Sequence, residues 1–590
     1  MAGIGNSRAS QPRGGYRPQQ MKFLLPRLDT PIGHVEANAS MIVELAGNAA
    51  ASGVSVLVTP ELGLCGYPPR DLLLREGFVD RCEEALGSIV AGIPQGMLVL
   101  VGHPESGPVS GGRCYNTLSA CRDGQVVARA RKQLLPGYDV FDEDRYFLPG
   151  ESPAWVEHEG RRIGLLVCED LWQADDVREH TSYEIDPVAS LVKMGCEVLV
   201  ASSASPFVVG KHERQCAALA RLAERHGVSI VTLNRAGAED DLVFDGAAIV
   251  AKPDGTIHCC RAPFSTQNEV LHDFGSDLPP LPVAASSPDE QRFHALVESV
   301  RSYVHKTGNR QVLIGLSGGI DSAVTAAIAA AALGGEQVIG VMMPSRHSSE
   351  HSLADSRELA DRLGLKACLE VPIESIHESV IESVRQAGQS FGSLEDGSLA
   401  DQNIQARARG IILMAMSNAH GGLVLSTGNK SEMAAGYATL YGDMCGALAV
   451  LGDVLKMDVY RLANWMNEHP KACGLASAPI PESSITKPPS AELRPDQVDQ
   501  DSLPPYEVLD EIVRRWIEEE QSAIRLIEET GFDAELVNQI LRMIDLSQFK
   551  RDQAAIIPKV SRRAFGRGRP WPVIARPGAA PAWISATAAS

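Results

Sequence analysis

Apolar runs that alternate with helical stretches, in two successive series along 590 residues, constrain the fold of this chain more than any other feature. In residues 21–275 the runs include VSVLVTP, MLVLVGHP and RIGLLVCED, separated by stretches such as HERQCAALARLAERHG. In residues 291–590 the runs QVLIGLS, QVIGVMMPS and GLVLSTGN are again separated by helical sequence. Short apolar runs bounded by turn residues indicate buried strands, so both halves are predicted to be α/β layered domains.

Residues 276–290 separate the two series and contain four prolines, a composition typical of linkers. We therefore expect a first domain at 21–275 and a second at 291–590, with two or more hydrophobic cores in all. Residues 1–20 are polar and rich in Gly, Arg and Gln, so they are predicted to be a disordered extension.

The second half should form a doubly wound parallel sheet, because its buried strands alternate with helices. In such a sheet, ligands bind at the carboxyl ends of the strands. The segments 390–402 and 475–505 are rich in Gly, Ser, Pro and Asp, and we expect them to be mobile loops near that edge.

The charge of the chain argues against some partners. Its 54 Lys and Arg residues against 74 Asp and Glu residues give a net charge of -20, which repels nucleic acid and anionic membranes. No apolar run approaches the roughly 18 residues of a membrane span. The twelve cysteines include no C-x2-C pair. We expect a soluble, cytoplasmic protein with reduced thiols that acts on small molecules.

The stretch GLSGGIDSAV, at 315–324, joins an apolar run to an alanine-rich helical run. Two adjacent glycines let the backbone turn tightly and aim several N–H groups at one anion, which predicts a phosphate site. The lysine of a G-x-x-x-x-G-K-[ST] loop is missing, so the γ-phosphate contact of ordinary kinases is not expected. A helix cap that follows a glycine turn is the alternative interpretation.

The string SGGIDSA after an apolar strand resembles the signature of the N-type ATP pyrophosphatases. That family cleaves ATP between the α- and β-phosphates to adenylate a carboxylate. The resemblance implies that this turn holds ATP and the leaving pyrophosphate, and that Asp321 helps to bind Mg²⁺. The ATP-binding residues that it implies here are Ser317, Gly318, Gly319, Ile320, Asp321 and Ser322.

The strings LSTGNKSEMAAGYATLYGD and LGDVLKMDVY resemble the NAD synthetase branch of the same superfamily. The match implies that Thr427 contacts ATP and that Glu432 binds metal or substrate. It also implies that Asp443 and Lys456 lie near a dinucleotide substrate, deamido-NAD. Taken alone, Glu432 is also explained as a first-turn carboxylate favoured by a helix dipole.

The stretch DQNIQARARG predicts the start of an amphipathic helix with Ile404, Ala408 and Ile411 on one face. In the resembled branch, the position of Asn403 contacts the dinucleotide. From the sequence alone, Asn403 is equally a helix cap.

A basic stretch near the C-terminus contrasts with the acidic remainder of the chain. Within it, Lys550 matches a position that binds the dinucleotide substrate in the resembled branch. Arg567 and Arg569 are predicted to belong to a solvated tail.

In the first half, Cys168 ends an apolar run and is followed by Glu and Asp. This pattern resembles the nucleophile turn of the nitrilase/amidase family, whose fold is an α-β-β-α sandwich. Glu61 and Lys132 follow other apolar runs in matching contexts. The resemblance implies that the cysteine attacks an amide, the glutamate moves the proton and the lysine stabilises the oxyanion. Taken singly, a core cysteine, a capping carboxylate and an exposed lysine are the ordinary interpretations.

Three further positions match residues that contact glutamine in glutaminase-type members of that family: Tyr138, Ser205 and Lys211. A generic amidase would have no reason to carry them. A different motif, HSSEH at 347–351, fits the H-x-x-E-H pattern of zinc peptidases. It follows a strand of the predicted nucleotide-binding sheet and no third ligand is evident, so zinc is not expected.

The two resemblances together indicate the glutamine-dependent NAD synthetase family, over nearly all of residues 21–575. They imply glutamine hydrolysis, internal ammonia transfer, ATP-Mg-dependent adenylation of deamido-NAD, amination to NAD and a homo-oligomer. One alternative is another amidotransferase, as in GMP or asparagine synthesis, but those families carry different glutaminase domains. The other alternative is an ammonia-dependent synthetase whose nitrilase-like half is a noncatalytic regulatory module.

Overall fold

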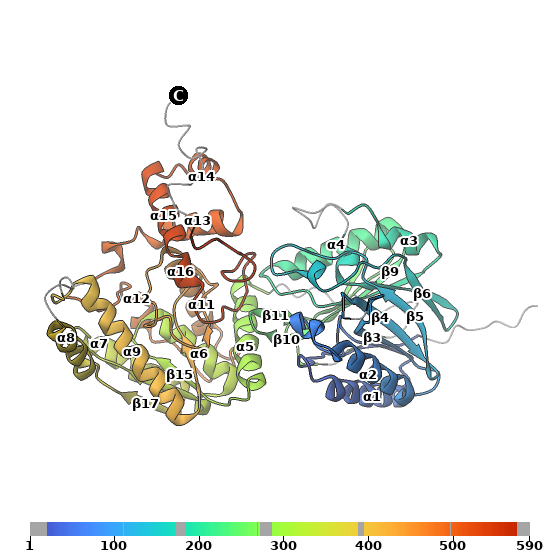
Figure 1. Cartoon of the computed structure of the whole chain (residues 1–590), viewed down its shortest axis with the longest axis horizontal. Helices are drawn as coiled ribbons and strands as arrows, with labels where there is room; N and C mark the ends of the chain where they lie inside the picture. The colour runs from blue at the N-terminus through green and yellow to red at the C-terminus, as the bar shows by residue number, and fades with distance from the viewer. Residues whose placement is uncertain are drawn as a thin grey trace, which may run out of the picture.

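The computed structural model describes residues 21–109, 111–172, 183–267, 269–271, 286–387, 394–495 and 497–574. The predicted extension, residues 276–285 of the predicted linker and residues 390–393 of the first predicted loop lie outside the described residues. The described residues form two α/β bodies that lie side by side (Figure 1). Among them, no helix combines the length and the apolarity needed to cross a bilayer.

The first body contains two six-stranded sheets, each made of mixed parallel and antiparallel pairs. The first sheet has the order β14-β1-β2-β3-β4-β5, from β1 (Phe23–Leu25), β2 (Val56–Val58), β3 (Leu98–Glu105), β4 (Tyr115–Arg122), β5 (Gln125–Arg131) and β14 (Glu269–Leu271). The second has the order β13-β12-β9-β8-β7-β6, from β6 (Ala154–His158), β7 (Arg161–Val167), β8 (Val198–Ser203), β9 (Ser229–Asn234), β12 (Ala248–Ala251) and β13 (Ile257–Arg261).

The two sheets face each other across one apolar core. Val56 and Leu98 of the first sheet share that core with Val198 and Val231 of the second. The outer faces are covered by α1 (Val35–Ala51) and α2 (Phe78–Gly92) on one side and by α3 (Pro187–Lys193) and α4 (Lys211–His226) on the other. Short 3-10 turns complete this body: η1 (Arg70–Leu74), η2 (Glu143–Arg145) and η3 (Cys168–Leu171). The predicted α-β-β-α sandwich is confirmed.

The second body is built on an all-parallel sheet with the order β17-β16-β15-β18-β19. Its strands are β15 (Val312–Gly315), β16 (Val338–Met342), β17 (Ala367–Glu370), β18 (Leu423–Ser426) and β19 (Leu448–Ala449). Alternate side chains enter different cores, because successive residues of a strand point to opposite faces. Ile314 packs with the helices of one face, and Leu313 packs with the helix of the other. The predicted doubly wound sheet is confirmed.

Helices cover both faces of this sheet. One face carries α5 (Pro288–Lys306), α6 (Ile320–Leu333), η4 (Gly335–Gln337), α7 (Glu350–Leu363) and α11 (Lys456–Glu468), and the other carries α8 (Glu374–Gln386) and α9 (Leu399–His420). The start of α9 was predicted two residues too late, and its buried face was misassigned. Ile411 is 56% exposed, whereas Ile412 is buried in the core.

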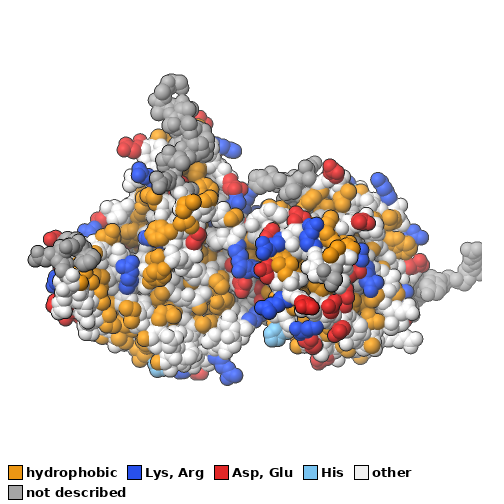
Figure 2. Space-filling model, in the orientation of Figure 1, with side chains coloured by type: hydrophobic (Ala, Val, Ile, Leu, Met, Phe, Trp, Pro, Cys, Tyr) orange, Lys and Arg blue, Asp and Glu red, His pale blue; other side chains and the backbone are white. Residues whose placement is uncertain are grey.

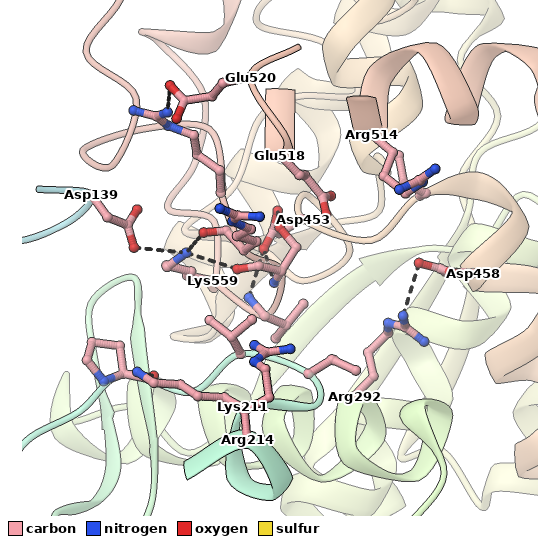
Figure 3. A pocket seen from close by; sticks show the side chains of 18 of the residues that line it. Asp139, Lys211, Arg214, Arg292, Asp453, Asp458, Arg514, Glu518, Glu520 and Lys559 are labelled. Carbon is pink, nitrogen blue, oxygen red and sulfur yellow. Dashed lines mark hydrogen bonds and ion pairs between the residues drawn. The ribbon is translucent and has the colours of Figure 1, made fainter. Parts of the chain in front are cut away.

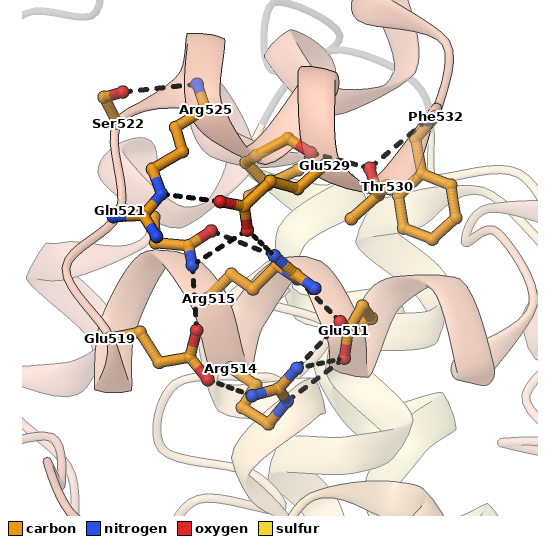
Figure 4. A network of polar contacts seen from close by, with 11 residues as sticks. Glu511, Arg514, Arg515, Glu519, Gln521, Ser522, Arg525, Glu529, Thr530 and Phe532 are labelled. Carbon is orange, nitrogen blue, oxygen red and sulfur yellow. Dashed lines mark hydrogen bonds and ion pairs between the residues drawn. The ribbon is translucent and has the colours of Figure 1, made fainter.

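The C-terminal helices form a separate apolar layer above the sheet edge (Figure 1). They are α10 (Lys430–Ala435), α13 (Tyr506–Val513), the π-helical turn η6 (Arg514–Glu518), α14 (Ala523–Thr530), α15 (Ala534–Leu546) and α16 (Gln548–Arg551), with the 3-10 turn η5 (Asp499–Asp501) before α13. The short helix α12 (Glu482–Thr486) packs instead against α6, α7 and α11. Charged side chains link α13, η6 and α14 (Figure 4): Arg515 contacts Glu511 and Glu529, each at 2.6 Å. Such half-exposed pairs contribute little stability individually, about 0–1 kcal/mol each.

One hydrophobic core crosses from the first body to the second. Phe207, Ala238 and Val243 of the first body belong to the same buried cluster as Phe293 of α5. The hairpin of β10 (Ala236–Glu239) and β11 (Leu242–Asp245) packs against α5. The expectation of several cores is right, but these two bodies are joined by shared apolar packing and not only by a linker. The domain boundaries themselves stay predictions.

Candidate active sites

The predicted catalytic carboxylate and lysine of the first body form a buried ion pair. Lys132 Nζ donates to Glu61 Oε1 at 2.7 Å, and both residues are 1% exposed. Asn116 Nδ2 donates to the same oxygen at 2.8 Å, and the N–H of Ala204 donates to Glu61 Oε2 at 2.9 Å. These donors fix the carboxylate in place. The alternative interpretations, a capping glutamate and an exposed lysine, are therefore wrong.

Cys168 follows β7 directly and opens the short turn η3. Its φ of 43° lies in the left-handed region, which a residue with a side chain occupies only when its surroundings hold it there. Asp170 supplies that support, because it accepts the N–H groups of Val167, Gln133 and Leu134 at 3.1, 2.9 and 3.0 Å. The nucleophile turn is thus tied to the strand end that carries Lys132. Burial, and then the charge of Glu61, raise the pKa of the Cys168 thiol, so it needs a base.

Glu143 is a functional candidate that the sequence analysis missed. Lys132 Nζ donates to Glu143 Oε1 at 2.8 Å, and Tyr67 Oη donates to the same oxygen at 3.0 Å. Burial opposes the charge of Lys132, but Glu143 and Glu61 outweigh it and hold the lysine pKa well above its usual value. Burial raises the pKa of Glu143 to about 7. No pattern marks Glu143, which stands among other acidic residues in the sequence.

The three residues predicted to contact glutamine, Tyr138, Ser205 and Lys211, line the same cavity as Cys168. This cavity has a volume of about 1030 Å³. Lys211 Nζ donates to Ser205 Oγ at 2.7 Å and to the carbonyl of Pro206 at 2.8 Å. Tyr138 Oη donates to both carboxylate oxygens of Glu169 at 3.2 Å. Burial lowers the pKa of Lys211. The structure therefore places all three predicted residues in the cavity that Cys168 lines, and their contact with glutamine stays a prediction.

The same cavity extends into the second body (Figure 3). Its walls there include Asp453, Asp510, Glu518 and Lys559. Glu511, which belongs to the charged contacts of Figure 4, also lines this end. A single hollow thus leads from the thiol to the neighbouring body.

In the second body, the glycine turn lies between β15 and α6, as the sequence predicts. Gly318 has a φ of 71°, and a Cβ there would lie 2.4 Å from the carbonyl oxygen of Ser352. The hydroxyls of Ser317 and Ser322 lie 3.2 Å apart across the turn. A cavity of about 300 Å³ opens at this edge, lined by most of the predicted ATP residues, namely Ser317, Gly319, Ile320, Asp321, Ser322 and Thr427.

Two carboxylates converge beside the glycine turn. Lys456 Nζ donates to Asp321 Oδ2 and to Glu432 Oε1, and Asn429 Nδ2 donates to Asp321 Oδ1 at 3.0 Å. Burial, reinforced by the charge of Asp321, raises the pKa of Glu432 to about 8. Glu432 also closes a capping box with Asn429 in the first turn of α10, so the interpretation as a first-turn carboxylate is confirmed, and its role in binding metal or substrate stays a prediction. No group of three metal-ligand side chains occurs among the described residues.

The predicted dinucleotide residues divide into two groups. Lys456 and Glu432 lie at the glycine turn, whereas the others surround the loop that follows α10. Asn403 Oδ1 accepts the Thr439 hydroxyl at 2.9 Å, and Asp443 Oδ1 accepts the Thr439 N–H at 2.7 Å. Lys550 Nζ donates to the carbonyls of Gly436 and Ala438 at 2.8 and 2.7 Å. Asn403 is not a helix cap, because α9 begins at Leu399 with Ser398 as its cap.

The segment predicted at 475–505 does lie at the carboxyl edge of the sheet, where residues 487–493 line the smaller cavity. Contacts hold it against α7: Glu492 Oε1 accepts the Ser352 hydroxyl at 2.8 Å, and Lys487 Nζ donates to Asp355 Oδ2 at 3.1 Å. Arg409, which the sequence analysis also missed, lines the same cavity, and burial lowers its pKa to about 10.

Two other sequence interpretations can be compared with the structure. In the HSSEH motif, His347 pairs with Asp396 at 3.7 Å while His351 is exposed. That this motif does not bind zinc stays a prediction. Arg567 is 58% exposed in its side chain, as expected of a solvated residue. Arg569 is not: it is 7% exposed and its guanidinium lies over the ring of Trp571.

Comparison with known proteins finds one family in each half of the chain. Residues 28–270 match the carbon-nitrogen hydrolase family, and residues 292–554 match the NAD synthase family. The glutamine-dependent NAD(+) synthetase of Xanthomonas campestris pv. campestris (strain 8004) is 42% identical over 565 residues, covering 94% of this chain and 97% of that protein. Fold and sites therefore define a carbon-nitrogen hydrolase joined to an NAD synthase.

Solved structures extend the comparison to the whole architecture. The glutamine-dependent NAD+ synthetase from Acinetobacter baumannii, in complex with ADP, has a TM-score of 0.71 at 34% identity and covers 94% of this chain and 98% of that chain. The glutamine-dependent NAD(+) synthetase from Cytophaga hutchinsonii, 20% identical, shares the fold with a TM-score of 0.79 over 95% of this chain and 99% of that chain. The chain belongs to the glutamine-dependent NAD(+) synthetase family.

Proposed function

We propose that this protein hydrolyses glutamine at Cys168 and uses the ammonia to convert deamido-NAD to NAD, with ATP cleaved to AMP and pyrophosphate. The observation that carries the proposal is the cavity of about 1030 Å³ that begins at Cys168 and ends against the second body. Internal transfer suits ammonia, because only the unprotonated molecule attacks a carbonyl and free ammonia is mostly protonated at neutral pH. The full-length relatives support the same activity.

At the first site, Glu61 takes the thiol proton while Cys168 Sγ attacks the amide carbon of glutamine. Lys132, already charged by its two carboxylate partners, stabilises the developing oxyanion. When the tetrahedral intermediate collapses, Glu61 gives the proton to the departing ammonia and leaves a thioester on Cys168. Water then hydrolyses the thioester to glutamate. Lys211, Ser205 and Tyr138 hold the remainder of glutamine in the cavity.

At the second site, the deamido-NAD carboxylate attacks the α-phosphorus of ATP and expels pyrophosphate. The adenylate is needed because a carboxylate is a poor electrophile, whereas AMP is a good leaving group that ammonia displaces. The N–H groups at the start of α6 and the hydroxyls of Ser317 and Ser322 receive the phosphates. The ADP bound to the Acinetobacter baumannii relative supports an adenine nucleotide here.

Magnesium fits the pair of carboxylates at the glycine turn. Asp321 and Glu432 both reach Lys456 Nζ, so their oxygens converge on one point. Mg²⁺ in nucleotide sites is commonly held by one or two carboxylates together with phosphate oxygens. Bound there, the ion would neutralise phosphate charge. The chain itself contributes the two carboxylates and the ammonium of Lys456, which offsets their repulsion.

Deamido-NAD is proposed to bind along the loop after α10. Asn403 and Asp443 meet at Thr439, and Lys550 lies against the carbonyls of Gly436 and Ala438. These polar groups come from three different elements. Burial raises the pKa of Asp443 to about 6, so its carboxylate is charged at neutral pH.

We further propose that two copies pair through the face formed by α9, the adjacent loop and α16. Figure 2 shows hydrophobic side chains gathered over this face. Ile411 and Met414 of α9, Tyr441 and Phe549 are all more than 40% exposed. Contiguous exposed apolar surface of this kind favours association.

Light scattering tests this pairing. It should give twice the mass of one chain for the wild type and the mass of one chain for Ile411→Glu. A monomeric wild type would contradict the pairing.

The compartment proposed is the cytoplasm. All twelve cysteines are free thiols, which agrees with a reducing environment. The thiol at Cys168 in particular must stay reduced to act as a nucleophile.

Purified Cys168→Ala protein tests the central proposal. With ATP, deamido-NAD and glutamine it should form no NAD, whereas with ammonium chloride it should match the wild type, because the two sites are separate. Cys196→Ala, which removes another buried thiol of the first body, is the matched control and should retain both activities. Glutamine-supported synthesis that survives in Cys168→Ala would favour a noncatalytic first body.

A further inference from the structure

Helix α11 carries Lys456 at its first position, and side chains from other helices hold its start. The first N–H groups of a helix have no partner inside the helix and need acceptors from elsewhere. The residue at the cap position is Leu455, whose side chain accepts no hydrogen bond. The N–H of Lys456 donates instead to Ser431 Oγ at 2.9 Å, and the N–H of Met457 donates to Asp510 Oδ2 at 2.8 Å. Acceptors from α10 and α13 therefore determine where α11 begins.

Asp510 governs both contacts, one directly and one through Ser431. Its other oxygen, Oδ1, accepts the hydroxyl of Ser431. A serine hydroxyl has one hydrogen to donate and two lone pairs. Because the hydrogen of Ser431 goes to Asp510, a lone pair of Ser431 Oγ is left to face the N–H of Lys456. Asp510 and Ser431 are both buried, so these contacts are shielded from solvent.

The side chain of Lys456 connects the same two helices to the glycine turn. Lys456 Nζ donates to Asp321 Oδ2 and, at 3.4 Å, to Glu432 Oε1. Glu432 follows Ser431 directly in α10. The contact between Ser431 and the N–H of Lys456 therefore ties the backbone that carries one carboxylate to the backbone that carries the ammonium.

Helix α13 supports the ammonium as well as the backbone of Lys456. Tyr506 lies one turn before Asp510 on α13, so the two side chains share a face of that helix. Lys456 Nζ lies 5.3 Å from the centre of the Tyr506 ring, a position in which a cation is attracted to the ring. The Tyr506 hydroxyl donates to Asp499 Oδ2 at 2.8 Å, which fixes the ring.

We propose that Asp510 is a positioning residue of the synthetase site, which holds Lys456 against α10 so that its ammonium stays between the two carboxylates beside the glycine turn. When the deamido-NAD carboxylate attacks the α-phosphorus, the electron pair of the broken P–O bond leaves with pyrophosphate. A fixed ammonium stabilises that charge. Asp510 acts through Lys456 and not on the substrates themselves. The inference rests on the proposed function and adds a residue that no motif marks.

Ammonia-supported NAD formation tests this role, since ammonium chloride supplies the nitrogen and glutamine hydrolysis is not needed. Asp510→Ala removes both acceptor oxygens. Asp510→Asn keeps one acceptor for the N–H of Met457 and has an amide that can donate to Ser431 Oγ. Glu507→Ala is the matched control, because Glu507 belongs to the same helix and is exposed. For each protein, kcat and the KM values for ATP and for deamido-NAD are measured.

In Asp510→Ala, kcat/KM for ATP should fall about tenfold or more, the size of one lost charged contact. The fall should include a higher KM for ATP, because the displaced ammonium lies at the glycine turn. The KM for deamido-NAD should stay near that of the wild type, because Asn403, Asp443 and Lys550 surround a different loop. Asp510→Asn should recover most of the activity, and Glu507→Ala should match the wild type. A mere loss of folded protein would lower kcat and leave both KM values unchanged.

A double-mutant cycle with Lys456→Met separates positioning from general damage. If Asp510 acts through the ammonium, adding Asp510→Ala to Lys456→Met should lower the rate by less than about twofold more. Ser431→Ala removes only the hydroxyl between Asp510 and Lys456, and it serves in the same cycle if Asp510→Ala does not fold.

An equal loss in the wild-type and Lys456→Met backgrounds would overturn the inference, because it would show a purely structural role. Full activity of Asp510→Ala, or an Asp510→Asn variant as impaired as Asp510→Ala, would overturn it as well. A wild type that forms no NAD from ammonia, ATP and deamido-NAD would instead refute the proposed function.

Discussion

The variant Gly318→Ala tests whether the glycine turn needs a residue without a side chain. At a φ of 71° an L-residue costs about 1–2 kcal/mol. The new Cβ would also lie 2.4 Å from the carbonyl oxygen and 2.8 Å from the Cα of Ser352, backbone atoms of α7 that cannot rotate away. Overpacking of this kind adds about 1–3 kcal/mol. We expect Gly318→Ala to lower the free energy of unfolding by roughly 2–5 kcal/mol.

Urea denaturation measures that loss, and ammonia-supported NAD formation measures the effect on the turn. The rate should fall about 10²-fold, since displaced N–H donors no longer meet the phosphate charge. Gly319→Ala is the control: its φ is -80°, and its Cβ would meet only the Ser317 hydroxyl at 3.3 Å. It should cost about 1 kcal/mol or less. If both variants unfold at the same urea concentration and work at the same rate, the close-approach argument is wrong.

Three further predictions follow from buried groups. Burial raises the pKa of Asp443 to about 6, so between about pH 4 and 6 the folded protein keeps a proton that the unfolded chain has released. Over that pH range the free energy of unfolding of the wild type should fall by about 3 kcal/mol relative to that of Asp443→Asn. Parallel curves of stability against pH for the two proteins would contradict this. Phe293→Ala should lower the free energy of unfolding by about 3–5 kcal/mol. Because the core is shared, glutaminase and synthetase activity should both be lost at a lower urea concentration than in the wild type. Glutaminase activity lost at an unchanged urea concentration would argue against a shared core. Glu143→Gln should reduce glutamine hydrolysis about 10²-fold or more but spare ammonia-supported synthesis, and equal losses would show a general folding defect.

The sequence predicted the strand ends better than it predicted the helix faces. Buried parallel strands are continuous apolar runs, so β15 and β18 and the turn after β15 could be located from the pattern alone. The sequence of α9 does not mark its buried face in this way. Ile411 and Ile412 are adjacent and equally apolar, yet Ile411 is 56% exposed and Ile412 is in the core. Only the packing of α9 against the sheet distinguishes them.

The candidate sites were predictable where a motif carried them, and not where tertiary contact did. Cys168 and Asp321 stand in short strings that restrict both the turn and the chemistry. Glu143 does not stand in such a string, and only the structure shows that its carboxylate lies 2.8 Å from Lys132 Nζ. Arg569 looked like a solvated tail because composition cannot show that Trp571 and Gln548 enclose it.

The shared core determines how the two chemistries can cooperate. Phe207 and Phe293 pack in one cluster, so the bodies cannot separate without exposing apolar surface at about 25 cal/mol per Å². The cavity of about 1030 Å³ that both bodies bound is therefore formed without any further closing of one body on the other. If ammonia passes through this cavity as proposed, we expect its control to come from movements of the groups at the two ends of the cavity. Tyr138 at one end donates to Glu169, the residue after Cys168. Asp453 at the other end pairs with Lys430, whose chain neighbour Asn429 donates to Asp321.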